Sequence, residues 1–293
     1  MGAMIKQILV SLDGSDYGEA ALQYGIALAK PFQATLHGLH VVDIVQIESP
    51  LLHDLVGATG ATPYFNLTTK MRENLELWGQ QVLAQFGQAC ESAAVPYVKH
   101  LVTGVVPTEI IHQTAEVDLI LLGRGGLHTE LSKAILGSAM ETVARRATKP
   151  TMVVPQRYQD IRKPLVATDA SPLAEAALRT AALFASALNV PLHVVHCSST
   201  HEAGEQPMAQ TQALLKREGI AGSVACCQGN PREDLLQYMH DNGHDALFIG
   251  AFGHHRMVEW ILGSTTQYLL RSCPDPLILC HKTENKQEHE EKA

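Results

Sequence analysis

The chain has 293 residues, of which 46% are hydrophobic and 18% charged, and its formal net charge is −8. A chain of this length is typical of about two globular domains. The acidic balance and the lack of a basic run argue against nucleic acid as a partner. We expect no membrane span, because no run of about 18 apolar residues is present, and no signal peptide, because the N-terminus leads directly into a strand-like segment.

The six cysteines are scattered along the chain and form no Cys-x-x-Cys pair. The adjacent pair, Cys226 and Cys227, cannot easily supply two ligands to one zinc ion. We therefore expect reduced thiols in a cytoplasmic protein, and no metal site built by the protein itself.

The two halves of the chain repeat one another. Residues 5–13 align with residues 161–169 at an offset of 156, which is 169 − 13. Further along, Gly104 pairs with Gly229 and Gly137 with Gly263, so copy two lacks about 30 residues of copy one. This long period predicts two complete domains, at 1–156 and 161–282. The polar segment 283–293 is expected to be a disordered tail.

Strand-like and helix-like segments alternate along each copy. Copy one is predicted to form strands at 8–12, 35–42, 97–102, 119–122 and 151–154, and helices at 16–30, 70–92, 108–114 and 138–147. Ser15 is a plausible N-cap of the first helix. Residues 44–69 are rich in Pro, Gly and Thr and are predicted to form a long loop or lid. In copy two, this loop and the helix after it are shortened to residues 198–219.

The alternation predicts an α/β fold with two tandem doubly wound domains. Each domain should contain a five-stranded parallel sheet between helices, and we expect the two sheets to be separate. In such sheets, ligands bind at the carboxyl ends of the strands. A ligand site is therefore expected in the loops at that edge.

A glycine-rich loop follows the fourth strand of each copy. Gly123-Arg124-Gly125-Gly126 precedes Gly137-Ser138, and Gly250-Ala251-Phe252-Gly253 precedes Gly263-Ser264. Glycines allow backbone N–H groups to approach a ligand closely, and a Gly-Ser pair that opens a helix presents amides and a hydroxyl to an anion. Neither a P-loop nor a Rossmann glycine fingerprint is present.

On these residues the chain resembles the universal stress protein family, as a tandem member of its ATP-binding branch. The family motif is G-x-x-G, nine residues, then G-[ST]; copy two matches it fully, whereas copy one has ten intervening residues. The aspartate after the first strand also matches, as Asp13 and Asp169. The resemblance implies an adenine nucleotide alpha hydrolase-like fold and ATP or AMP as the ligand, with accompanying Mg²⁺ left open.

The resemblance also implies a set of nucleotide-binding residues in each copy. Aspartate would lie near adenine and ribose, a strand-two backbone would contact adenine, and the glycines with the helix N-terminus would hold ribose and phosphates. In copy one these residues are Asp13, Val41, Gly123, Gly126, Gly137, Ser138 and Ala139. In copy two they are Asp169, Cys197, Gly250, Gly253, Gly263, Ser264 and Thr265.

Structural interpretations of the same residues stay open. The aspartates could be turn or cap residues, the serines simple N-caps, and Arg124 either a phosphate ligand or a solvated side chain. We expect packed or hydrogen-bonded roles for the histidines of the second strands, because positions i and i+3 of a strand face opposite sides. No catalytic constellation is recognisable. The open functions are a non-enzymatic ATP- or AMP-binding stress protein, a nucleotide-free interaction module, and a slow ATPase.

Family resemblance predicts how the copies assemble. The last strands, 151–154 and 277–280, should pair across a pseudo-two-fold axis, because each would otherwise leave an apolar open edge. A further homodimer of tandem chains is left open. Copy two is expected to hold phosphate more dependably than copy one, because it keeps the motif spacing.

Overall fold

The computed structural model describes residues 4–47, 64–127, 138–198, 201–230, 232–250 and 263–281. Its strands are β1 Gln7–Ser11, β2 Thr35–Asp43, β3 Tyr97–Gly104, β4 Leu119–Gly123, β5 Thr151–Val154, β6 Pro164–Thr168, β7 Leu192–Ser198, β8 Gly222–Gln228, β9 Ala246–Gly250 and β10 Leu277–Cys280. The helices of copy one are α1 Asp16–Phe32, α2 Ile44–Ile47, α4 Tyr64–Ser92, α5 Val106–His112, the 3₁₀ turn η1 Gln113–Glu116 and α6 Ser138–Arg146. Those of copy two are α7 Pro172–Leu188, α8 His201–Glu218, α9 Glu233–Asp241 and α10 Ser264–Ser272.

All ten strands lie in one sheet, in the order β3-β2-β1-β4-β5-β10-β9-β6-β7-β8. Within each half the five strands are parallel, as the sequence predicts. The expectation of two separate sheets is wrong, because β5 and β10 pair antiparallel, with Val153 opposite Leu277. This pairing confirms the prediction for the last strands. It has a clear physical cause, since every residue of both strands is buried and an open edge would expose them.

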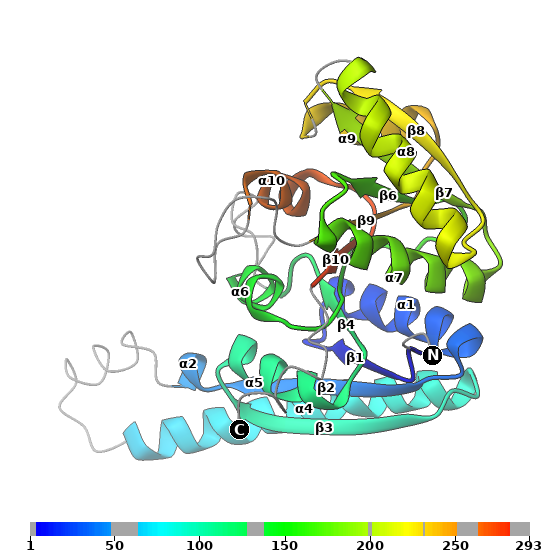
Figure 1. Cartoon of the computed structure of the whole chain (residues 1–293). Helices are drawn as coiled ribbons and strands as arrows, with labels where there is room; N and C mark the ends of the chain where they lie inside the picture. Colours follow the sequence, from blue (N-terminus) through cyan, green and yellow to red (C-terminus); the bar gives the residue numbers. More distant parts are fainter. Residues whose placement is uncertain are drawn as a thin grey trace, which may run out of the picture.

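Two helical layers cover the sheet, as Figure 1 shows for α1 and α7 on one side and α6 and α10 on the other. The first layer packs α1, α4, α7 and α8 against side chains such as Ile8 and Val166, and the second packs α5, α6, α9 and α10 against side chains such as Leu9 and Leu165. Successive strand residues thus serve opposite cores, which is why the strands read as continuous apolar runs.

Equivalent side chains hold equivalent turns in the two copies. The Asp118 carboxylate accepts the backbone N–H groups of Lys6 and Gln7, and Asp245 does the same for Arg162 and Lys163. The predicted N-cap is confirmed, because Ser15 Oγ accepts the Gly18 N–H of α1. The duplication seen in the sequence is therefore also a duplication of local hydrogen bonding.

The region predicted as a long loop at 44–69 is in part helical. Helix α2 begins directly after β2, and α4 begins at Tyr64 rather than at residue 70. Pro, Gly and Thr dominate only the middle of this region, and residues 48–63 lie outside the described part, as does the tail 283–293. In copy two, α8 occupies the compressed segment, as expected. No described helix is long and apolar enough to cross a membrane.

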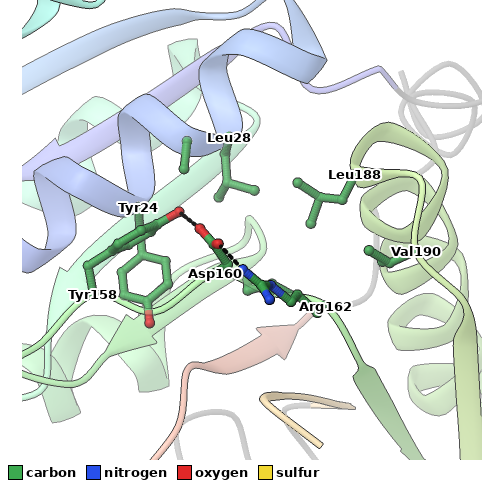
Figure 2. Close-up of a pocket in the computed structure, with 9 residues that line it drawn as sticks. Tyr24, Leu28, Tyr158, Asp160, Arg162, Leu188 and Val190 are labelled. Carbon is green, nitrogen blue, oxygen red and sulfur yellow. Dashed lines mark hydrogen bonds and ion pairs between the residues drawn. The ribbon is translucent and has the colours of Figure 1, made fainter.

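The linker between the halves packs against α1 and closes one side of a cavity of about 290 Å³ (Figure 2). Tyr158 stacks edge-on against Tyr24, with ring centroids 4.7 Å apart, and its hydroxyl donates to Asp160. Asp160 in turn forms a 2.8 Å ion pair with Arg162. Both charged groups are largely exposed, so this cavity is a shallow feature of the junction, away from the carboxyl ends of the strands.

Candidate functional site

A cavity of about 340 Å³ lies in copy two at the carboxyl ends of β6, β7 and β9. The N-terminus of α10 forms its far wall, and Leu235 and Leu269 contribute apolar surface. The cavity brings together every predicted copy-two residue that the structure describes: Asp169, Cys197, Gly250, Gly263, Ser264 and Thr265. The remaining one, Gly253, lies outside the described residues. The volume is within the range of small-molecule sites.

The cavity wall at Asp169 is fixed by the turn that starts α7. Asp169 Oδ1 accepts the Ser171 N–H at 3.0 Å, and Ser171 Oγ caps the helix by accepting from Ala174. The predicted cap role and the predicted site role of Asp169 are thus compatible, since this hydrogen bond holds the side chain at the cavity.

The glycines of copy two serve two different purposes. A Cβ at Gly250 would come within 2.9 Å of the Leu173 backbone, so this glycine allows α7 to approach the end of β9. At Gly263, the nearest atom to a Cβ is Thr266 Oγ1 at 4.0 Å, and φ is −59°. Neither backbone conformation nor packing among the described residues requires glycine at position 263. Gly263 lines the cavity, so a side chain there would add bulk to its wall.

The N-terminus of α10 carries the properties expected of an anion-binding wall. Gly263 is the N-cap and supplies no side-chain acceptor, and no acidic residue occupies the first turn. The first intrahelical bond runs from the Gln267 N–H to the Gly263 carbonyl. The amides of Ser264, Thr265 and Thr266 therefore precede the intrahelical ladder and point out of the helix end.

In copy one the glycine loop lies directly on Asp13. Oδ1 accepts the Ser15 N–H and hydroxyl, and Oδ2 accepts the Leu127 N–H at 3.2 Å. A Cβ at Gly126 would meet Oδ2 at 2.5 Å, and one at Gly123 would meet the Tyr17 side chain at 2.6 Å. These two predicted ligands thus have local packing roles in the structure.

The other copy-one residues are placed less completely. Val41 lies in β2 with its side chain against the second core, and Ser138 and Ala139 open α6. Gly137 lies outside the described residues. The structure thus brings Asp13, Gly123 and Gly126 to the carboxyl edge of the sheet. The first glycines of the motif and the start of α6 are described, whereas residues 128–137 between them are not.

Two cysteines form the β7–β8 side of the copy-two site. Cys197 lines the cavity, and Cys227 is its register partner in β8. Burial raises the pKa of both thiols, with the neighbouring thiol adding to the effect for Cys197. All six cysteines are free thiols. The neutral thiol of Cys197 therefore gives this wall an apolar, uncharged character.

The strand-two histidines are held by hydrogen bonds, as predicted. His40 Nδ1 contacts the Leu12 carbonyl at 2.8 Å, and His196 Nδ1 contacts the Thr168 carbonyl at 2.7 Å. His37 contacts His100 and Gln7, and His193 contacts Ser223. No group of three His, Cys, Asp or Glu side chains among the described residues could hold a metal ion.

Arg124 is not the solvated side chain that was one of its two possible roles in the sequence. Its guanidinium is mostly buried at the seam between the copies, where Nη2 donates to the Asp275 carbonyl at 3.0 Å, and burial lowers its pKa. Arg232 is the residue that sequence reasoning missed. It lies just before α9, and its guanidinium donates to the Ser264 hydroxyl of the cavity wall. A basic residue three positions after the Gly229 turn was the available signal.

Comparison with known proteins gives a consistent family. A model of the universal stress protein family matches residues 4–155 and again 161–281. Universal stress protein Slr1230 of Synechocystis is 27% identical over 287 residues, 94% of this chain and 99% of that protein. Universal stress protein MJ0577 of Methanocaldococcus jannaschii is 27% identical over 164 residues, 54% of this chain and 99% of its own length.

The fold comparison agrees over nearly the whole chain. The crystal structure of a universal stress protein from Archaeoglobus fulgidus superposes with a TM-score of 0.73 at 22% identity. The match covers 94% of this chain and 98% of that one. The chain therefore belongs to the universal stress protein family, with one family domain in each half.

Proposed function

We propose that this protein binds an adenine nucleotide, ATP or AMP, in the copy-two cavity and acts as a non-enzymatic component of a stress response. The observation that carries the proposal is Gly263 at the N-terminus of α10: neither its φ nor packing among the described residues requires a glycine there, and it lines the cavity. A ligand with phosphates is the chemistry that suits such a helix end.

The rest of the cavity suits the nucleoside end of the same ligand. The Asp169 carboxylate can accept hydrogen bonds from ribose hydroxyls, and the uncharged Cys197 wall with Leu235 and Leu269 can contact a flat base. Three or four charge-assisted hydrogen bonds to phosphate, less the cost of association, are consistent with roughly micromolar affinity, about −8 kcal/mol.

A binding function is favoured over catalysis by the groups at the cavity. Its described lining holds one carboxylate, no histidine and a thiol whose raised pKa keeps it protonated, so a general base next to the phosphates is not apparent among those residues. The free thiols support a reducing compartment, and we propose the cytoplasm. Mg²⁺ would accompany a bound polyphosphate.

Nucleotide released from the purified, denatured protein should be identified by mass spectrometry, and ATP and AMP titrations with and without Mg²⁺ should follow by calorimetry. We expect adenine nucleotide in the released fraction and saturable binding at roughly micromolar concentration. Steady-state phosphate release measured alongside should stay at the buffer rate.

Two results would overturn this proposal in different directions. A folded protein that releases no nucleotide and binds none would support the interaction-module function. Phosphate release that rises in proportion to protein concentration, and that Gly263→Val reduces, would support the slow ATPase instead.

A further inference from the structure

Arg232 contacts a residue that lines the copy-two cavity. It is the last residue before α9, in the loop that leaves β8 at the carboxyl edge of the sheet. Its Nη2 donates to the hydroxyl of Ser264, which is the first residue of α10 and part of the cavity wall. The guanidinium therefore reaches across from the β8–α9 loop to the N-terminus of α10.

The charge of Arg232 is not neutralised by a neighbouring acid. The side chain is exposed, and among the described residues no carboxylate forms an ion pair with it. The nearby Asp234 carboxylate accepts the Asn230 N–H and so is used within the loop. The partner of the guanidinium is the neutral Ser264 hydroxyl. The positive charge of Arg232 and its remaining N–H donors are therefore available to bind an anion.

We propose that Arg232 binds the phosphate chain of the nucleotide and makes the copy-two site selective for nucleotides over nucleosides. This inference rests on the proposed nucleotide function. It adds the residue that distinguishes a charged ligand from an uncharged one. Because Arg232 contacts Ser264, the first residue of α10, a phosphate group bound at that helix end is within reach of both the guanidinium and the amides. The guanidinium exchanges the Ser264 hydroxyl for phosphate oxygens.

Copy one has no arginine at the position equivalent to Arg232. With Gly104 aligned to Gly229, the offset of 125 places Pro107 at the position of Arg232. Pro107 lies in the first turn of α5 and carries neither a charge nor a donor. The two halves should therefore differ in the preference for phosphate, with selectivity for charged ligands confined to copy two.

The test is calorimetry on the full chain with ATP and adenosine as separate titrants. Arg232→Ala should weaken ATP binding at one site by about tenfold, about 1.4 kcal/mol, while adenosine affinity changes by less than about twofold. Arg232→Lys should restore part of the ATP affinity, since it keeps the charge and loses the fork. The salt dependence of ATP binding should be shallower for Arg232→Ala than for the parent.

Arg217→Ala is the matched control. Arg217 is exposed on α8, pairs with Glu218 and does not line the cavity, so the same charge change there should leave ATP affinity unchanged. Equal weakening by both variants would mean a general effect of net charge and overturn the inference.

The remaining outcomes separate the inference from the function on which it rests. If the parent binds ATP and Arg232→Ala binds it as tightly, the inference is wrong and the proposed function stands. If Arg232→Ala loses ATP and adenosine alike, Arg232 has a structural role and the inference is again wrong. If the folded parent binds neither ligand, the proposed function is wrong and the inference falls with it.

Discussion

Asp13 and Leu127 lie 114 residues apart in the sequence, yet the Leu127 N–H donates to Oδ2 of Asp13 at 3.2 Å. The other oxygen of the same carboxylate accepts the N–H and hydroxyl of Ser15 at the start of α1. One side chain thus joins the turn after β1 to the glycine loop after β4. In copy two, the equivalent Asp169 accepts the Ser171 N–H in the same way and lines the cavity together with the N-terminus of α10.

The hydrogen bonds of Asp13 and the cavity position of Asp169 lead to a separate prediction for each aspartate. Asp13→Ala removes the acceptor for three donors, so the free energy of unfolding should fall by about 1–3 kcal/mol. Asp169→Ala should chiefly weaken adenosine binding, by about tenfold, and leave contacts to inorganic phosphate unchanged. Urea denaturation and calorimetry of both variants measure the two effects.

Asp13→Asn is a useful companion variant, because its one amide oxygen can still accept hydrogen bonds either from Ser15 or from the Leu127 N–H. It should lose less stability than Asp13→Ala. The assignment would be contradicted if Asp13→Ala unfolded at the same urea concentration as the parent, or if Asp169→Ala bound adenosine with parental affinity.

Gly263→Val is expected to separate binding from folding. The valine side chain would enter the cavity next to the α10 amides and weaken ATP binding at copy two by at least about tenfold, about 1.4 kcal/mol. The melting temperature should change little, because φ is −59° and, among the described residues, the atom nearest to a Cβ there is 4.0 Å away.

Gly250→Ala provides the opposite case. Its Cβ would come within 2.9 Å of backbone atoms of α7, so it should lower the melting temperature even though the new side chain is smaller. A Gly263→Val protein that melts like the parent and binds ATP as tightly would remove the main support for the nucleotide site.

Much of this architecture could be predicted from the residue pattern. The periodicity and the Pro and Gly breaks placed β5 at its observed bounds. The alternation of strands and helices predicted that the strands within each half are parallel. The helix start at Tyr64 was not predicted, because Thr68 and Thr69 have modest helix propensity and follow a segment that contains Pro and Gly. The single sheet follows from the β5–β10 pairing, which sequence reasoning predicted without drawing that consequence.

The site was harder to predict, since several side chains act across long sequence distances. The aspartate, glycine and serine positions converge in copy two as expected. The reach of Arg232 to Ser264 depends on how two loops 32 residues apart meet in space, which no local pattern encodes. The same holds for Arg124, whose partner Asp275 lies in the other half.

Arg124→Met is predicted to be neutral or stabilising by up to about 2 kcal/mol. The guanidinium is largely buried, its Nε has no hydrogen-bond partner among the described atoms, and burial lowers its pKa. Methionine fills similar space without carrying a charge into the seam. Denaturant unfolding measures the change, and Arg124→Ala, which leaves a cavity, should be less stable than Arg124→Met.

Nucleotide affinity should be unchanged in Arg124→Met, because the guanidinium of Arg124 donates to the Asp275 carbonyl at the seam between the copies. Loss of ATP binding in a folded Arg124→Met protein would restore the phosphate role that the sequence left open for this residue.

His281, directly after β10, predicts a loss of stability under mildly acidic conditions. Its side chain is buried, and burial lowers its pKa from the usual 6.5 to about 4. Between these two values the unfolded chain binds a proton that the folded chain does not, so the free energy of unfolding falls as the pH drops from 6.5 toward 4. The pKa values of His40 and His244 are lowered by burial as well, which adds to the effect in the same direction.

The expected contribution of His281 between about pH 7.5 and about pH 5.5 is about 1 kcal/mol. Urea denaturation at the two pH values gives the total loss for the parent and for His281→Gln, which cannot titrate. The variant should lose about 1 kcal/mol less over this interval, whatever its absolute stability. An identical loss in the parent and in His281→Gln would show that His281 keeps an ordinary pKa in the folded protein.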